Sequence, residues 1–373
     1  MALLFFSPGF IFSQLHVTNN NSATQLAQVI LGNGVTISNA TLNCGVNGAG
    51  TFSHTGMNLG ITTGIILTTG YAAGAANPGS FFCNVTNGNN FSDPDLTLIN
   101  TRANYDVCIL NFDFVPLCDT VRINYIFGSE EYPQYLHQLY NDLFGIFLTG
   151  PNPNGGNYNA KNIATLPNGL TPVSIDSINE GWPTTSNGTH SEYYHDNFNH
   201  PNNDIAYNGY TIPITSKAAL IACSQYHMKI AIADGGNGHN DSGVFIKGNS
   251  LGCMNAPSVA STTVFSCADK GKIKVNISNY SGTPSFTWMP GGQSADSISN
   301  VVAGTYTCYV NLPGVCNNFT TVATMPDFSS LALPSKTFSI CKGQSVQLNA
   351  TGAVTYTWLP ATGLNNQYIY NPS

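Results

Sequence analysis

Charged side chains are scarce in this sequence. Lys, Arg, Asp and Glu make up 8 % of its 373 residues, whereas about 25 % is usual for globular domains. The 11 basic residues are scattered and the formal net charge is −7, so no basic stripe is available to neutralise phosphates. We therefore expect no nucleic-acid partner.

Catalytic signatures are also missing. The sequence contains no HExxH, GxSxG, P-loop or strand-linked GxGxxG motif, so we expect a non-catalytic protein. One enzyme alternative stays open, because paired carboxylates such as Glu131 and Asp142 could serve as the acid and base of a secreted polysaccharide hydrolase. A purely structural stalk protein is the other alternative.

Apolar runs of membrane-spanning length are absent as well. Residues 1–14 (MALLFFSPGFIFSQ) are apolar and end in small and polar residues, which is typical of a secretory signal peptide. The usual basic start is missing, as in a truncated signal peptide, and a buried N-terminal strand is the alternative. Beyond this segment we expect no transmembrane span, and we expect an extracellular protein on the outer cell surface.

The ten cysteines fit an oxidising compartment. They are dispersed, without CxxC or Cys/His spacings typical of zinc sites, so disulfides are expected. The spacing does not reveal the pairing. Six of them could close within one domain: Cys44, Cys83, Cys108, Cys118, Cys223 and Cys253.

Short β-type runs dominate the first 250 residues. Val121, Ile123, Tyr125 and Phe127 alternate with residues of the opposite strand face, including Ile126. Similar runs, separated by Gly, Asn and Pro clusters, cover 61–69, 107–115, 119–127, 143–149, 210–215, 226–234 and 243–247. This pattern predicts an all-β fold, a large jelly-roll-like β-sandwich.

One short helix is expected near the N-terminus. Ser22 and Gln25 form a capping-box pattern before the apolar residues Leu26, Val29 and Ile30. Helical periodicity nearly vanishes after this segment.

The sequence pattern changes near residue 256, where shorter Thr- and Val-rich strands are expected to begin. Thr287-Trp288-Met289-Pro290 is echoed by Thr357-Trp358-Leu359-Pro360, which suggests consecutive Ig-like β-sandwich repeats. We expect a sandwich domain over 15–255, an Ig-like repeat over 256–327 and an incomplete second Ig-like or PKD-like domain over 328–373. Cys341 is then left without a partner.

Three acidic segments stand out because acidic residues are rare elsewhere. They are 128–132 (GSEEY), 140–142 (YND) and 233–243 (ADGGNGHNDSG), and each adjoins an apolar strand. Since strand ends can converge at one edge of a sandwich, we expect these segments to form an oxygen cage of the kind that Ca²⁺ prefers. The expected ligands are Glu130, Glu131, Asn141, Asp142, Asp234 and Asp241.

Ordinary turn chemistry is the alternative for these acids. Asp234 and Asp241 could accept hydrogen bonds from turn amides while Glu130 and Glu131 face solvent. The 234–243 loop matches neither the EF-hand spacing nor the calcium-binding nonapeptide repeat, which requires Asp at the position of Asn240. Composition alone favours neither interpretation.

A histidine cluster is a weaker candidate. His190, His195 and His200 recur every five residues in an Asn-rich loop, whereas zinc ligands on helices are three or four residues apart. Exposed loop histidines are the preferred interpretation.

A series of motifs in residues 25–252 resembles the choice-of-anchor L domain of Bacteroidota surface proteins. The motifs are LTTG (67–70), FDFVP (112–116), YIFGSEEYP (125–133), YNDLFGIFLTGP (140–151), IAIAD (230–234) and DSGVF (241–245). The resemblance implies a signal peptide, this domain, Ig-like repeats similar to those of gliding-motility adhesins, and a C-terminal sorting domain, which we expect to follow the incomplete second repeat. It therefore implies export by the type IX secretion system, with the secretion and anchoring machinery as partners.

The resemblance does not identify a ligand. From the long Asn-, Thr- and Tyr-rich loops we expect an adhesion or display protein that binds an extracellular glycan or protein.

Overall fold

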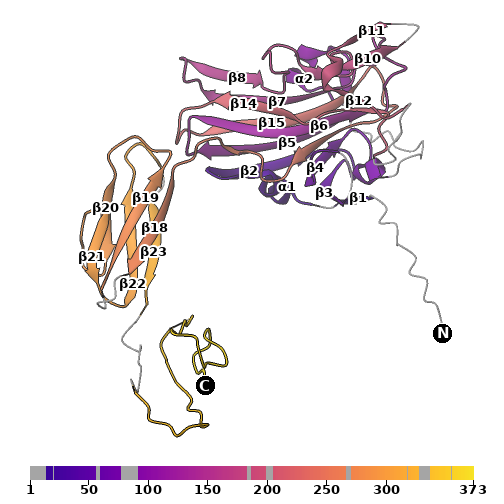
Figure 1. Cartoon of the computed structure of the whole chain (residues 1–373). Helices are drawn as coiled ribbons and strands as arrows, with labels where there is room; N and C mark the ends of the chain where they lie inside the picture. The colour runs from indigo at the N-terminus through magenta and orange to yellow at the C-terminus, as the bar shows by residue number, and fades with distance from the viewer. Residues whose placement is uncertain are drawn as a thin grey trace, which may run out of the picture. The chain divides into compact units, whose positions relative to one another are not determined.

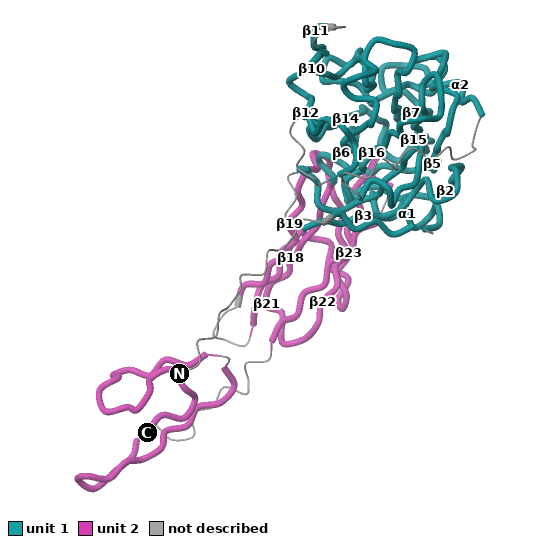
Figure 2. The backbone as a smooth tube through the Cα atoms, turned by 90° about the vertical axis from the view of Figure 1, so that its right-hand side faces the viewer, with its two compact units in different colours: residues 1–256 teal, residues 257–373 magenta. Residues whose placement is uncertain are grey.

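The computed structural model describes residues 14–19, 21–55, 59–76, 91–182, 186–198, 205–265, 270–316, 318–326, 337–353 and 355–373. The chain divides into two compact units, residues 1–256 and 257–373 (Figures 1 and 2). Within the described ranges, no helix is long and apolar enough to cross a membrane. Thirteen of the 14 residues interpreted as a signal peptide, 1–13, lie outside those ranges.

A nine-stranded antiparallel sheet forms one layer of the first unit. Its strands are β1 (Gln14–Thr18), β3 (Ala49–Thr55), β4 (Thr63–Thr68), β6 (Thr120–Ser129), β12 (Tyr194–Asp196), β13 (Gly209–Thr211), β14 (Ile214–Ala219), β16 (Ser242–Lys247) and β17 (Gly252–Cys253). The order is β1-β3-β4-β16-β6-β13-β12, and both β14 and β17 also pair with β6.

A six-stranded antiparallel sheet forms the other layer. Its strands are β2 (Val35–Asn43), β5 (Ala103–Pro116), β7 (Leu143–Pro151), β8 (Asn157–Asn162), β9 (Val173–Ser174) and β15 (Tyr226–Gly235). The order is β2-β5-β15-β7-β8, with β9 pairing β7. A separate hairpin joins β10 (Asn179–Trp182) to β11 (Ser186–Thr189).

The core lies between the two sheets because each strand alternates its side chains. Val121, Ile123, Tyr125 and Phe127 of β6 are all buried in this core, together with residues of β5, β7 and β15 such as Phe112. Ile126 points to the other face of its sheet, where a second apolar cluster covers it. The all-β sandwich predicted from the alternation is therefore confirmed.

The predicted helix is present as α1 (Ala23–Ile30), and Ser22 caps it. The Ser22 hydroxyl accepts a hydrogen bond from the Gln25 amide, and the Gln25 side chain accepts one from the Ser22 amide, which is the predicted capping box. The structure adds a second helix, α2 (Pro94–Ile99), where the sequence shows no clear helical periodicity. Two short 3₁₀ helices also occur, η1 (Ala72–Ala76) and η2 (Ser191–Tyr193).

Disulfides close the first unit as expected for an oxidising compartment. Cys44 pairs with Cys108, and Cys118 pairs with Cys253. Cys223 and Cys316 are also in disulfides. Cys308, which is buried, and Cys341, which is exposed, are free thiols.

The second unit contains two small antiparallel sheets. One consists of β18 (Ser258–Phe265), β19 (Gly271–Ser278) and β21 (Ser297–Val301), and the other of β20 (Ser285–Met289), β22 (Gly304–Asn311) and β23 (Phe319–Met325). Trp288 is fully buried in their shared core, beside residues such as Ile273 and Val310. The described residues of 337–373 form no strand.

A candidate cation site between the two sheets

Six acidic residues meet where strands of the two sheets begin or end. We call them the acidic cluster: Asp106, Glu130, Glu131, Asp142, Asp234 and Asp241. Asp106 and Asp234 lie on β5 and β15. Glu130 and Glu131 are the first two residues after β6, and Asp142 and Asp241 directly precede β7 and β16. Five of the six residues predicted as calcium ligands thus come together.

Strand register explains why these acids are neighbours. Ser242 of β16 pairs with Ser129 of β6, so the residues just beyond that pair, Asp241 and Glu130, lie side by side. The Asp241 amide donates a hydrogen bond to Glu130 Oε2 at 3.1 Å, and the Glu130 amide donates one to the Asp241 carbonyl at 3.0 Å.

Strand register also brings Asp142 and Asp234 together in the six-stranded sheet. Ala233 of β15 pairs with Leu143 of β7, so Asp234 and Asp142 are adjacent one residue further along. A carboxylate can approach Gly235 closely there, and the Gly235 amide donates a hydrogen bond to Asp142 Oδ1 at 2.9 Å.

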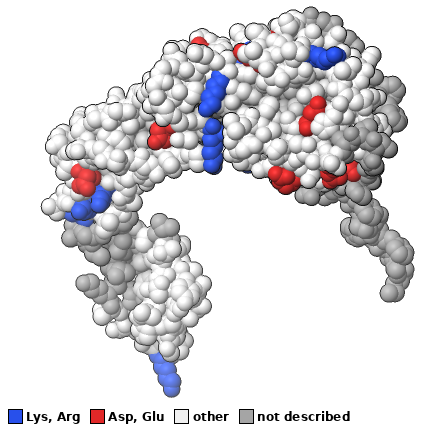
Figure 3. All heavy atoms as spheres, turned by 90° about the horizontal axis from the view of Figure 1, so that it is seen from above, with Lys and Arg blue, Asp and Glu red and all other residues white. Residues whose placement is uncertain are grey.

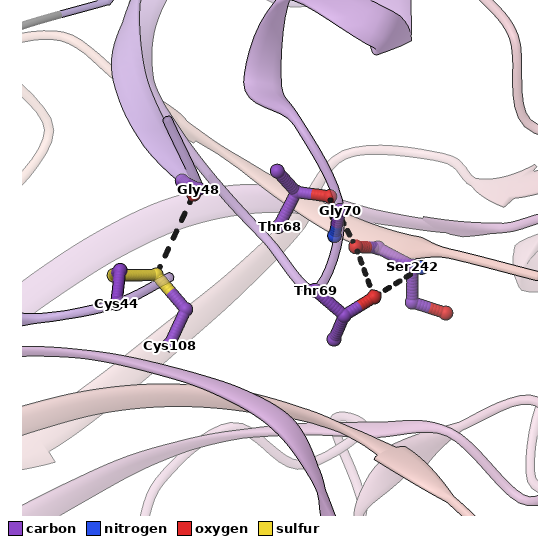
Figure 4. Close-up of a disulfide and its surroundings, with 7 residues drawn as sticks. All are labelled: Cys44, Gly48, Thr68, Thr69, Gly70, Cys108 and Ser242. Atoms are coloured by element: carbon purple, nitrogen blue, oxygen red, sulfur yellow. Dashed lines mark hydrogen bonds between the residues drawn. A yellow bond between two sulfur atoms is a disulfide. The ribbon is translucent and has the colours of Figure 1, made fainter. Parts of the chain in front are cut away.

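Hydroxyl groups connect these acids to the nine-stranded sheet. The Ser242 hydroxyl donates a hydrogen bond to Asp142 Oδ2 at 2.7 Å. Figure 4 shows Thr68 and Thr69, at the end of β4, beside Ser242. The Thr68 hydroxyl donates a hydrogen bond to the Ser242 carbonyl at 2.7 Å, and the Ser242 amide donates one to the Thr69 hydroxyl at 2.9 Å.

A disulfide lies close to this junction. Figure 4 shows Cys44–Cys108 near the Gly48 carbonyl, which is 3.5 Å from Cys108 Sγ. The Thr68 amide donates a hydrogen bond to the same carbonyl at 2.8 Å. The Gly48 carbonyl thus lies between the disulfide and the Thr68 amide.

Burial dominates the electrostatics of the acidic cluster. Asp142 and Asp234 are fully buried, and Glu131 is 1 % exposed. Desolvation raises the pKa of Glu131 to about 9, with a further contribution from the charge of Asp142. Burial raises the pKa of Asp142 to about 7, against the opposing hydrogen bond from the Gly235 amide.

Asp234 is surrounded by other acids. Burial, then the charges of Asp142, Asp241 and Asp106, raise its pKa well above the ordinary value. A hydrogen bond with the Thr69 side chain opposes this rise in pKa, whereas Glu131 Oε2 accepts no hydrogen bond among the described residues. Buried, negatively charged oxygens without a donor are costly.

Counter-charge does not come from basic side chains. In the described part of the chain, the ion pairs involve Lys229, His137 and His227. None of these side chains pairs with Glu131, Asp142 or Asp234. The three acids must therefore be neutralised by protons or by a bound cation.

Asp106 is the member that sequence reasoning missed. It precedes the apolar run 107–115, and no second acid beside it signals a site. A β-bulge in the β5–β15 pairing lies at this point, and Asp106 has a left-handed φ of 46°. That bulge lets an otherwise unremarkable Asp enter the interior, where it is 1 % exposed.

Asn141, the sixth predicted ligand, has its oxygens engaged elsewhere. Its side-chain oxygen accepts a hydrogen bond from the Asp176 amide at 3.2 Å, and its carbonyl accepts one from the Asn100 side chain at 2.8 Å. Asn141 thus anchors two neighbouring loops next to the acidic cluster.

Acidic side chains alone do not form a finished ligand shell. Across the residues that the structure describes, no three or more His, Cys, Asp or Glu side chains are arranged to hold a metal ion. A cation in the acidic cluster would therefore also need hydroxyl oxygens, backbone carbonyls or water, which are the usual additional ligands of Ca²⁺. Ser242 and Thr69 supply such hydroxyls at the junction.

The histidines predicted as a weaker candidate have separate surroundings. His190 Nδ1 lies 2.9 Å from the Ser177 carbonyl. The His195 ring packs against Tyr210 with centroids 4.6 Å apart. His200 lies outside the described residues.

A comparison with protein families gives one match. The model of the choice-of-anchor L domain covers residues 15–252, a range that includes every member of the acidic cluster. No curated protein matches this chain.

Proposed function

This chain belongs to the choice-of-anchor L domain family, and from this premise we propose that it is an extracellular adhesion and display protein whose sandwich is stabilised by calcium. The family comprises non-enzymatic domains of surface-anchored or secreted proteins. The proposed calcium role rests on one observation: buried acids from both sheets meet without a basic partner for Glu131, Asp142 or Asp234.

Calcium suits the chemistry of the acidic cluster. A hard divalent cation prefers carboxylate, hydroxyl and carbonyl oxygens, and these are the groups at the junction of β4, β6, β7, β15 and β16. Asp142, Asp234 and Glu131 are the proposed central ligands, with Asp106, Glu130 and Asp241 around them. A bound ion would convert mutual repulsion into attraction and hold the loops together.

The hydrolase alternative is less consistent with this geometry. An acid–base pair must reach a glycosidic bond from both sides, yet Glu131 and Asp142 are buried. Their raised pKa values follow mainly from that burial. Buried acids of this kind fit a structural cation site and need no substrate to account for them.

Adhesion is the proposed role of the surface. Lys, Arg, Asp and Glu are few on the face shown in Figure 3, so recognition there would depend mainly on neutral polar and aromatic groups. A groove of about 450 Å³ lies between residues 163–169 and β14, and Tyr193, Thr215 and Lys217 are among the residues that line it. A ring, hydroxyls and a cation are groups that bind glycans, so a glycan is our preferred ligand over a protein.

A stalk of Ig-like domains is proposed for the second unit. Trp288 donates from its indole to the Ala295 carbonyl, and Trp358 donates likewise to the Ile369 carbonyl. Their backbone amides bond to the carbonyls of Gln293 and Gln367. This shared pattern supports an Ig-like repeat over 256–327 and part of another over 328–373, following the domain 15–255.

Export by a type IX system in a member of the Bacteroidota, through a signal peptide within 1–14, completes the proposal. Its support is the family membership together with the Ig-like echo. Secretion in such a host, compared with a host whose type IX system is deleted, tests it: retention in the periplasm of the deletion strain is expected.

Thermal unfolding of the full chain in calcium and in chelator tests the calcium role. We expect calcium to raise the melting temperature, by an amount equivalent to about 2.7 kcal/mol at a hundredfold excess over Kd. A glycan array, read with wild type and Tyr193→Ala, tests adhesion. An unchanged melting temperature in chelator would contradict the calcium role, and polysaccharide hydrolysis abolished by Glu131→Gln would contradict the non-catalytic role.

A further inference from the structure

Lys229 lies between two aspartates on the outer face of the six-stranded sheet. Its Nζ is 2.6 Å from Asp93 Oδ2 and 2.5 Å from Asp95 Oδ2. Lys229 belongs to β15 and the two acids to the start of α2, so residues distant in sequence meet here. The side chains are 14 %, 7 % and 21 % exposed, respectively.

The surroundings of this trio are apolar. Lys229 Nζ sits 5.1 Å from the centroid of the Phe147 ring. Leu96, Phe147 and Ala231 belong to the apolar cluster that packs α2 onto the sheet. This apolar packing limits the access of water to the three groups, and water is the product of an amide condensation.

The two aspartates have different roles because their partners differ. Asp93 is the N-cap of α2, and its Oδ1 accepts hydrogen bonds from the amides of Asp95 and Leu96, both at 3.0 Å. These two hydrogen bonds hold the Asp93 carboxyl group in place, with Oδ2 at 2.6 Å from Lys229 Nζ. Asp95 is in the first turn, where its Oδ2 makes the shortest contact with Lys229.

From this geometry we propose that Lys229 and Asp95 form an intramolecular isopeptide bond, with Asp93 as the proton carrier. The amide would join Lys229 Nζ to Asp95 Cγ. It would tie α2 covalently to the central strand β15 of the six-stranded sheet. This inference does not depend on the calcium site or on ligand binding.

The reaction needs no oxidant and no external co-reactant. A proton passes from the Lys229 ammonium to the Asp95 carboxylate, which gives a neutral amine and a neutral acid. The nitrogen lone pair attacks the Asp95 carboxyl carbon, and the C=O π electrons move to oxygen. Asp93 accepts a proton from nitrogen and delivers it to the hydroxyl oxygen. The C=O re-forms, one water leaves, and an amide remains.

Fixed proximity makes this step feasible without a separate enzyme. The nucleophile, the acyl group and the proton carrier are within hydrogen-bonding distance in the folded chain, so the reaction is intramolecular and loses little further entropy. An unfolded chain would not hold the three groups together.

Mass spectrometry of the purified full chain tests the bond. After disulfide reduction and digestion with chymotrypsin, we expect a branched peptide joining Lys229 to Asp95, lighter by one water than the sum of its two arms. Trypsin should fail to cut after Lys229. If wild type yields only the two unlinked peptides, the contact is an ion pair and the proposal is overturned.

Three variants separate bond formation from folding. Lys229→Arg keeps the cation but has no reactive amine, and Asp95→Ala removes the acyl group, so each should abolish the branched peptide. Asp93→Ser keeps an N-cap side chain while removing the carboxylate, and it should reduce the cross-linked fraction at least tenfold. Full cross-linking in Asp93→Ser would eliminate the proton-carrier role, and a branched peptide in Asp95→Ala would eliminate the assignment of Asp95.

Discussion

Ser242 donates a hydrogen bond from its hydroxyl to Asp142 Oδ2 at 2.7 Å, and this contact joins the two sheets. Ser242 begins β16 of the nine-stranded sheet, whereas Asp142 directly precedes β7 of the six-stranded sheet. Asp142 also accepts a hydrogen bond from Gly235 of β15. One buried carboxyl group thus connects three strands from both layers.

Ser242→Ala should destabilise the first unit by about 1–3 kcal/mol, because a buried acid loses a hydroxyl donor that cannot be replaced by water. Chemical denaturation measures the change. Ser53→Ala, at an exposed position of β3, is the matched control and should change the free energy of unfolding by less than about 0.5 kcal/mol. Equal effects of the two substitutions would show that the Ser242–Asp142 contact is energetically neutral.

The effect of Asp234→Asn on the melting temperature should depend on calcium and reverse its direction when calcium is added. In chelator the variant should melt at or above the wild-type temperature, because a buried carboxyl beside Asp142, Asp241 and Asp106 is replaced by a neutral amide. In calcium it should melt below wild type, because a proposed ligand is lost. Differential scanning calorimetry with and without calcium measures both shifts.

Asp119→Asn is the control for this experiment, since Asp119 is exposed and lies outside the acidic cluster. It should respond to calcium as wild type does. An Asp234→Asn variant that gains as much from calcium as wild type would remove Asp234 from the ligand set.

Asp113→Asn should make the free energy of unfolding depend less steeply on pH in the acid range. The hydrogen bond from the Asn39 side chain, then that from His227, lowers the pKa of Asp113 below 3.8. A depressed pKa in the folded state contributes stability above the unfolded value, and this contribution is lost as pH falls through the folded value. Urea denaturation between about pH 5 and pH 2 should therefore show a smaller loss for the variant.

The effect should be small, because the Asp113 side chain is 21 % exposed and that of His227 is 46 % exposed. His227→Gln should produce part of the same flattening. A variant curve parallel to wild type over this range would mean that Asp113 does not contribute to acid unfolding.

Trp288→Ala should destabilise the second unit by about 3–5 kcal/mol, because it removes a fully buried ring from a small core and leaves a cavity. It also deletes the indole hydrogen bond to Ala295. Hydrogen exchange of β19 and β22 amides reports the loss. Trp358→Ala is the comparison: its ring is only partly buried, so a smaller change is expected, and a larger one would contradict the difference in burial.

Local sequence patterns predicted much of the sandwich. The alternation of Val121, Ile123, Tyr125 and Phe127 identified β6 and its inner face, because a strand has a period of two whatever its neighbours are. Ser22 and Gln25 predicted the start of α1, since a capping box is completed within one turn. The six-residue helix α2 was missed because it is too short for a periodic signal, and packing of Leu96 and capping by Asp93 sustain it.

The sequence by itself determined the all-β class, the capped first helix and the strand-end position of the acidic segments, because these depend on residues close together in the chain. Only the tertiary structure decided which acids meet. The registers of β6 with β16 and of β7 with β15 placed Glu130 beside Asp241 and Asp142 beside Asp234. Register depends on long-range packing of the core face.

Asp106 and Asn141 show what the sequence could not predict about the site. Asp106 belongs to the acidic cluster but was not expected there, and Asn141 was expected as a ligand but has its oxygens engaged elsewhere. A bulge in β5 brings Asp106 into the interior, although its sequence context resembles that of any acid before a strand. Asn141 lies beside Asp142 in sequence, yet the Asp176 amide and the Asn100 side chain occupy its oxygens. Such partners come from loops far away in the chain, so the folded backbone alone selects them.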